Sequence, residues 1–183
     1  EKETCVAFLD VSGFKFRMHQ GLKGAATFLD SFYTRFFIVL RNFNAENSST
    51  GVWIRSLVVS DCAVIFVDNS AVEQDMRRDL RAILKFVRQI NRDLIVQIYD
   101  LPILTTCSID YGKFKYEERI EFASIEKEYF LGQPYLNAVL DNDKLKRHPG
   151  KCRVLIKNSS LSLVLRQQDP FLFLERTRKH YYF

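Results

Sequence analysis

The feature that most constrains the fold is a pair of short apolar runs separated by only two residues. The runs are residues 52–59 (VWIRSLVV) and 62–67 (CAVIFV). Branched and aromatic side chains of this kind favour β-strands. Because only Ser60 and Asp61 stand between the runs, they predict a β-hairpin with a tight turn.

Two longer segments on either side of this hairpin, residues 22–42 and 72–94, repeat apolar residues at helical spacing. Each predicts a helix that packs by one face. The stripe of the second segment consists of Val72, Met76, Leu80, Ile83, Leu84, Val87, Ile90 and Leu94. The basic residues of this segment fall mostly on its other faces, and we interpret them as a solvated surface. They are Arg77, Arg78, Arg81, Lys85, Arg88 and Arg92.

The rest of the pattern completes an order of elements. Further strands are expected at residues 4–11 (TCVAFLDV), 104–111 (LTTCSIDY, ending at Gly112), 152–156, 161–165 and 171–174. A loop is expected at 44–51, residues 113–128 stay unassigned, and Gly132-Gln133-Pro134 opens a helix that ends before Pro149. The order β-α-β-β-α-β, followed by a helix and strands, predicts a ferredoxin-like α/β fold of the α+β type. We expect a single domain over residues 1–183.

Composition limits the function classes. Hydrophobic residues make up 47% and charged residues 27% of the chain, an ordinary globular balance. The net charge of +5 suits an anionic ligand without indicating nucleic acid. The four cysteines form no CxxC pair, so neither a zinc site nor a disulfide framework is expected, and Cys62 and Cys107 are expected to be buried thiols. No apolar run approaches the ~20 residues that span a bilayer, so we expect a cytoplasmic protein without a membrane partner.

Two aspartates stand where this topology brings strand ends together. Asp10 ends the first strand, before a glycine turn, and Asp61 stands in the hairpin turn. Converging carboxylates need a cation between them, and Mg²⁺ or Mn²⁺ shared with substrate phosphates is the usual solution. A second cation would assist the attacking and leaving oxygens. The alternatives are a capping or turn role for Asp10 and a strand-ending role for Asp61.

The neighbourhood of these aspartates adds donors for phosphate. Gly13 permits close backbone approach, and the turn amides can hold phosphate oxygens. Lys15 and Arg17 can add charge. Arg55 shares strand parity with Asp61, so both face one side of a regular strand. Its guanidinium either reads a base or phosphate or rests at a solvated edge.

Four motifs resemble class III nucleotidyl cyclases. They are FLDVSGF (8–14), VVSDCAVIF (58–66), SIDYG (108–112) and LGQPYLNAVLDND (131–143). In that family they carry the first metal aspartate, the hairpin with the second, a later strand and a dimer-facing helix. AFLDVSGF, together with Ser60-Asp61 in place of the usual glycine-aspartate, is most similar to the stand-alone pyrimidine cyclases of bacterial Pycsar anti-phage systems.

The resemblance implies a palm core in which Asp10, Asp61 and the carbonyl of Val11 hold two divalent cations. It implies that the turn at Gly13 and Phe14 contacts the triphosphate. It further implies that Asn137 orients the ribose from the other subunit of a head-to-tail homodimer. In two places the chain departs from the family: Asp141 stands where the family has a transition-state arginine, and Leu57 stands where it has a purine-reading lysine.

The resulting expectation is cyclisation of a pyrimidine nucleoside triphosphate, with UTP favoured over CTP, to a 3′,5′-cyclic monophosphate. The product would be an anti-phage signal read by a separate effector. For the arginine lost at Asp141, another cation such as Lys144, slow turnover or a shifted helix register are the alternatives. The rival functions are a palm-type dinucleotide cyclase or polymerase, and a non-catalytic module that binds nucleotide or a partner. A nucleic-acid binder using the basic helix face is disfavoured because aromatic interleaving and a recognised motif are absent.

Overall fold

The computed structural model describes residues 2–69, 73, 75–96, 103–121, 125–145, 148–155, 175–177 and 179–183. One sheet of eight strands organises them, and seven strands follow the order β2-β3-β1-β4-β6-β8-β7 while β5 pairs with β4 beside this path. The strands are β1 (Lys2–Val11), β2 (Trp53–Val59), β3 (Cys62–Asp68), β4 (Thr105–Glu121), β5 (Ile125–Gly132), β6 (Cys152–Leu155), β7 (Glu175–Arg176) and β8 (His180–Tyr182). The helices are α1 (Phe14–Gln20), α2 (Leu22–Glu46), the short 3-10 helix η1 (Ser48–Thr50), α3 (Met76–Val96) and α4 (Gln133–Leu145).

The first four strands have the ferredoxin-like arrangement. β1 lies between β3 and β4 and is antiparallel to both, and β2 pairs antiparallel with β3. The βαββαβ order expected from the sequence, including the tight hairpin at Ser60 and Asp61, is therefore confirmed, and so are the additional C-terminal strands.

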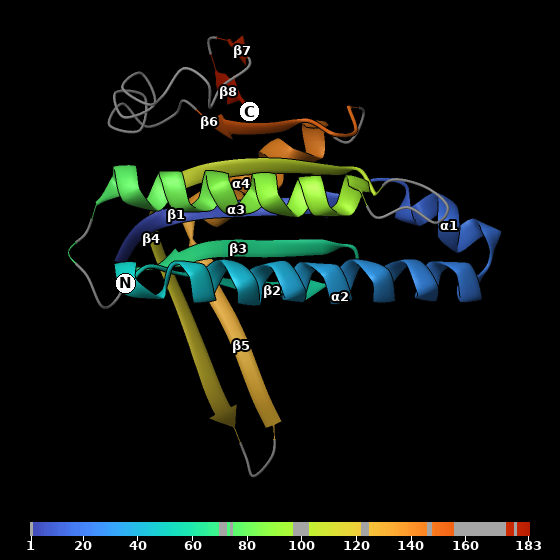
Figure 1. Cartoon of the computed structure of the whole chain (residues 1–183), viewed down its shortest axis with the longest axis horizontal. Coiled ribbons are helices and arrows are strands. Elements are labelled where there is room, and N and C mark those ends of the chain that lie inside the picture. The colour runs from blue at the N-terminus through green and yellow to red at the C-terminus, as the bar shows by residue number, and fades with distance from the viewer. Residues whose placement is uncertain are drawn as a thin grey trace.

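Helices α2 and α3 lie side by side over one face of the sheet (Figure 1). The odd-numbered residues of β1 face them, and the apolar stripes of both helices are buried. Phe36 and Phe86 meet edge to face at 5.8 Å between ring centroids, and Phe43 approaches Phe86 at 5.4 Å. Each fully buried aromatic or aliphatic side chain contributes about 1.5–3 kcal/mol as an upper estimate. This core makes the sheet a rigid platform for its other face.

The other face carries the even-numbered residues of β1 and is covered only in part. Val6, Val64, Phe66 and Phe114 form a small second cluster there. Helix α4 lies against β4 and β1 on this face, through contacts from β4 side chains.

Some element boundaries differ from expectation. Helix α1 was not expected, and α2 runs through residues 44–46, which were assigned to a loop. Strand β4 does not end at Gly112 but continues to Glu121, and with β5 it forms a long hairpin that projects from the body (Figure 1). Gly112 instead permits close packing, because an added Cβ would lie 3.4 Å from Pro134 Cδ at the start of α4. Val72 and the strands expected at 161–165 and 171–174 lie outside the described residues.

Candidate metal and nucleotide site

Asp10 and Asp61 come together at one end of the central strands. The register pairs Asp10 with Cys62, the residue after Asp61, and the Val11 amide donates a 2.8 Å hydrogen bond to the Asp61 carbonyl. One ligand atom each from Asp10, Asp61 and Cys62 lies within 4.8 Å of the others, and all three residues are half-buried. Two carboxylates this close repel each other strongly unless a cation stands between them. The donor set therefore fits a divalent cation.

The turns around this cluster are tightly built. Ser60 has a φ of 54°, a left-handed conformation that is uncommon for a residue with a side chain. Gly13 has a φ of 86° and stands at the N-terminus of α1. The Ser12 amide donates to the Leu104 carbonyl at 2.8 Å, which ties the turn to the start of β4. These bonds fix the backbone of Val11 beside Asp61.

The basic and aromatic residues after the turn divide into two groups. Phe14 stacks on Phe28 with ring centroids 6.3 Å apart, and the Arg17 guanidinium lies 4.4 Å from the centre of the same ring. Both side chains therefore pack against α2. Lys15 is exposed beside the turn. Lys15 and Arg17 are the two basic side chains expected to add charge for phosphate. Of these two, Arg17 packs over the Phe28 ring and Lys15 has no packing role of this kind.

Asn137 and Arg55 lie elsewhere on the same face. Asn137 Nδ2 donates a 2.6 Å hydrogen bond to Asp110, and Asp110 is paired with Val6. Val6 is paired with Phe66, which is paired in turn with Arg55. The strand register thus places Asn137 and Arg55 in one row across the sheet. That row lies four residues along β1 from Asp10, a separation of about 13 Å.

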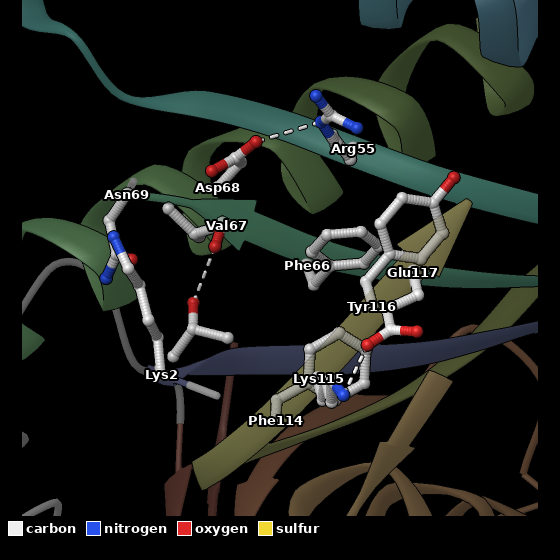
Figure 2. A pocket seen from close by; sticks show the side chains of 11 residues that line it. Lys2, Arg55, Phe66, Val67, Asp68, Asn69, Phe114, Lys115, Tyr116 and Glu117 are labelled. Carbon is white, nitrogen blue, oxygen red and sulfur yellow. Dashed lines mark hydrogen bonds and ion pairs between the residues drawn. The ribbon is translucent and has the colours of Figure 1, made fainter. Parts of the chain in front are cut away.

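The Arg55 end of this row is a pocket of about 380 Å³ (Figure 2). Arg55 Nε lies 2.9 Å from Asp68 Oδ2, and the guanidinium carbon lies 5.7 Å from the centre of the Tyr116 ring. Phe66 contacts Tyr116 and Phe114, each at 5.0 Å between ring centroids. Arg55 is thus a half-exposed cation held over an aromatic wall. An aromatic wall with a few directed polar groups is typical of small-molecule sites.

No protein-family model matches the sequence, and a comparison with curated proteins finds no match either. Solved structures do match. The guanylate cyclase domain from Catenaria anguillulae in complex with GTP has a TM-score of 0.68 at 10% identity, over 99% of this chain and 94% of that one.

An adenylyl cyclase from P. aeruginosa matches with a TM-score of 0.67 at 15% identity, over 99% of this chain and 92% of that one. A dimeric guanylyl cyclase domain from Blastocladiella emersonii matches with a TM-score of 0.63 at 11% identity, over 100% and 96% of the two chains. The chain has the nucleotidyl cyclase fold. At these identities the likeness concerns the fold alone, and the expected palm core is confirmed.

Within the cyclase fold, Asp141 is a buried anion. It accepts hydrogen bonds from Arg153 Nε at 2.7 Å and from Ser108 Oγ at 2.9 Å, and it lies 3.0 Å from His180 Nε2. Burial by itself would raise the pKa of Asp141, but the hydrogen bonds and charges of Arg153 and His180 outweigh it and lower that pKa. Asp141 therefore links α4 to β6 and β8. Lys144, the alternative cation of the sequence reasoning, is exposed on α4.

His180 does not behave as a simple ion-pair partner. Burial lowers its pKa more than the hydrogen bond and charge of Asp141 raise it, so the net shift is downward. The pKa values of both partners thus fall. We attribute this to Arg153, which already neutralises Asp141 and leaves His180 as a neutral donor in a buried place.

Sequence reasoning missed three residues near these sites. Cys62 was expected to be a buried thiol, but it is half-buried and faces the two aspartates, whereas Cys107 is buried as expected. The pairing of the strands could have indicated this. Paired residues on neighbouring strands point to the same side of a sheet, so Cys62, which is paired with Asp10, must share its face. Asp110 and Arg153 gave no signal, since their roles depend on how α4 packs.

Among the described residues, no helix is long and apolar enough to cross a membrane.

Proposed function

We propose that this chain is a nucleotidyl cyclase that converts a pyrimidine nucleoside triphosphate, UTP in preference to CTP, to the 3′,5′-cyclic monophosphate and pyrophosphate. The ribose 3′-oxygen loses its proton and attacks the α-phosphorus, and pyrophosphate leaves with the electrons of the broken P–O bond. The observation that carries this proposal is the approach of Asp10 and Asp61 at one end of the sheet in a cyclase fold.

The residue roles follow from the geometry and the motifs. Asp10, Asp61 and the Val11 carbonyl would hold two divalent cations, Mg²⁺ or Mn²⁺. Bound cations of this kind activate the attacking hydroxyl and screen the phosphate charge. The turn at Gly13 and Phe14 and the exposed Lys15 would position the triphosphate. Positioning and electrostatics are the main contributions that a protein makes to such a displacement.

The distance along β1 supports a site shared by two chains. Reacting atoms must approach within about 3–3.5 Å, so a residue that orients the ribose has to lie close to the metal aspartates. Asn137 lies in a row about 13 Å from Asp10 on its own chain. A head-to-tail homodimer brings Asn137 of one protomer to the aspartates of its partner. The exposed Leu136 and Leu140 beside Asn137 on α4 give that interface apolar surface.

The pocket at Arg55 supports recognition of a base from the same half-site as Asn137. Tyr116 and Phe66 offer ring faces, Arg55 offers donors, and Asp68 offers an acceptor. A donor beside an acceptor can match the edge of uracil or of cytosine. Leu57, where the resembled family has a purine-reading lysine, argues against a purine.

The pyrimidine assignment and the motif resemblance to Pycsar cyclases together lead us to propose a biological role. The product would be an anti-phage signal read by a separate effector protein.

A second candidate function is a cyclase-like module that binds nucleotide without turnover. The observation in its favour is Asp141, a buried anion where the family has an arginine. Asp10 and Asp61 are nevertheless both present, which favours the cyclase. The two functions differ in whether product accumulates.

The deciding experiment is incubation of the protein with ATP, GTP, CTP or UTP and Mn²⁺, followed by mass spectrometry of the products. A cyclic pyrimidine monophosphate from the wild type, and none from the matched Asp10→Asn and Asp61→Asn variants, is the expected result. A cyclic purine would retain the cyclase and reject the pyrimidine assignment. Linear or dimeric products would favour a dinucleotide cyclase, and metal-dependent binding without product would favour the module.

A further inference from the structure

Strand β4 holds helix α4 through three polar contacts from alternate residues, all buried on the strand side. They are Thr106 Oγ1 with Asn142 Nδ2 at 3.2 Å, Ser108 Oγ with Asp141 Oδ2 at 2.9 Å, and Asp110 Oδ2 with Asn137 Nδ2 at 2.6 Å. Alternate strand residues share one face, so the three contacts form a line beneath the helix. This line sets the position and the rotation of α4 on the sheet.

The third contact differs from the other two because its helix partner belongs to the proposed nucleotide site. The Asn137 amide presents its nitrogen, the donor end, to Asp110 Oδ2. The Asn137 oxygen in turn accepts a 2.9 Å hydrogen bond from Gln133 Nε2, one turn earlier on α4. These two contacts together fix which end of the amide points in which direction.

The amide held in this way still has one N–H and one oxygen lone pair to offer. A sugar hydroxyl donates one hydrogen bond and accepts others, so it can use both groups at once. Asn137 is half-buried, whereas Asp110 is only 3% exposed and lies beneath it. The carboxylate therefore cannot reach a bound nucleotide except through Asn137.

We propose that Asp110 is a positioning residue, which holds the Asn137 amide in the one orientation that can receive the ribose. This inference rests on the proposed function, because it needs Asn137 to contact the sugar. In chemical terms, a buried carboxylate on β4 controls a side chain on α4 that takes part in turnover. The effect of Asp110 on Asn137 does not depend on the charge at Asp10 and Asp61.

The test compares two substitutions of Asp110 with the loss of Asn137, and combines one of them with that loss. Asp110→Leu has nearly the same shape and accepts no hydrogen bond, and we expect it to lower kcat at least tenfold with less change in KM. Asp110→Asn keeps an acceptor oxygen and should restore kcat to within about threefold of the wild type. The double variant Asp110→Leu/Asn137→Ala should be no slower than Asn137→Ala alone, because coupled residues do not add.

Ser108→Ala is the matched control. It removes the neighbouring contact between the same strand and the same helix without touching Asn137, so it should lose stability but keep kcat. If Asp110→Leu does not fold, Asp110→Ala makes the same comparison. Wild-type kcat in Asp110→Leu, or a loss that adds in full to that of Asn137→Ala, would overturn the inference.

Binding separates this inference from the proposed function. A UTP analogue with a methylene bridge between its α- and β-phosphates cannot release pyrophosphate, and its dissociation constant can be measured without turnover. If the wild type cyclises no nucleotide, the proposed function fails. The inference is then supported when Asp110→Leu and Asn137→Ala weaken binding by the same factor and Asp110→Asn does not. It is rejected when Asp110→Leu binds like the wild type.

Discussion

Arg153 Nε lies 2.7 Å from Asp141 Oδ2, and the same guanidinium donates through its second terminal nitrogen to the Asp141 carbonyl at 2.9 Å. Both side chains are less than 10% exposed. The arginine therefore binds the side chain and the backbone of one residue on α4. A buried pair of this kind tolerates the loss of both charges better than the loss of one.

We predict that Arg153→Ala lowers the free energy of unfolding by about 3–5 kcal/mol, since it leaves the Asp141 carboxylate buried without its main partner. For a chain of this size that is roughly a 10 °C fall in Tm. The control is Lys144→Ala at an exposed position of α4, which should change the free energy by less than about 0.5 kcal/mol. The double variant Asp141→Leu/Arg153→Leu should be more stable than either single leucine variant. Equal Tm values for Arg153→Ala and the control would contradict this account.

The lowered pKa of His180 predicts a loss of stability in mild acid. Below its ordinary pKa of 6.5 the unfolded chain binds a proton at this histidine more readily than the folded chain does. Stability therefore falls as the pH drops below about 6.5, and Asp141, with a lowered pKa, adds a further loss below its ordinary 3.8. His180→Gln keeps a donor for Asp141 and does not titrate, so its Tm should fall less between pH 7.5 and 5.5. His148→Gln, at an exposed position, should retain the wild-type dependence.

Cys62 beside the two aspartates predicts inhibition by a thiophilic metal. Zn²⁺ binds thiolate together with carboxylate ligands, whereas Mg²⁺ and Mn²⁺ prefer oxygen. We expect Zn²⁺ to displace the activating cation in the wild type at a concentration at least tenfold lower than in Cys62→Ser. The readout is cyclase rate, and equilibrium binding of Zn²⁺ checks it without turnover. The control is Cys152→Ser, a buried thiol on β6 away from the site, and equal inhibition of all three proteins would exclude Cys62 as a ligand.

The only tryptophan of the chain stands beside a residue of the pocket proposed to bind the base. Trp53 is paired with Asp68, which binds Arg55. We expect UTP to change the fluorescence of Trp53, and Arg55→Ala to weaken that binding about tenfold or more and to alter the preference between UTP and CTP. Lys115→Ala, at the rim of the same pocket, is the control for a change of net charge. Unchanged affinity and preference in Arg55→Ala would leave this residue without a role in base recognition.

Mixing inactive chains tests whether the site is shared. In the proposed site, Asp10→Ala destroys the half that would hold metal, and Asn137→Ala destroys the half that would hold ribose. A mixed dimer then has one site with both halves intact, so the mixture should recover up to about a quarter of wild-type activity. Asp10→Ala mixed with Asp61→Ala removes the same half from both sites and should recover none. Recovery in both mixtures or in neither would argue against a shared site.

The parts of the fold that could be predicted are those set by local pattern. The hairpin at Ser60 and Asp61 follows from two apolar runs and a two-residue gap, and its register then brings Asp61 to Asp10. The true length of β4 had a signal as well, because Phe114 and Tyr116 alternate with charged residues beyond Gly112. Gly112 was expected to end the strand, whereas in the structure its missing side chain leaves room for Pro134 at the start of α4.

The contacts of α4 could not be predicted in the same way. Asp110 and Asn137 are 27 residues apart, and Asp141 and Arg153 belong to different elements. Each pair depends on the rotation of one helix on the sheet, which depends on side-chain packing rather than on local periodicity. The resemblance indicated an aspartate in place of an arginine at 141. Only the packing of α4 explains this aspartate, because its carboxylate is buried where Arg153 can bind it.

The four-residue interval along β1 between the row of Asp10 and the row of Asn137 has a kinetic consequence. With the proposed division of the site, a single chain holds two unlike halves that cannot reach each other. Below the dissociation constant of the dimer, the rate of product formation would then rise with the square of the protein concentration. A twofold change in expression would change the signal fourfold, and the amount of protein in the cell would itself set the threshold of the response.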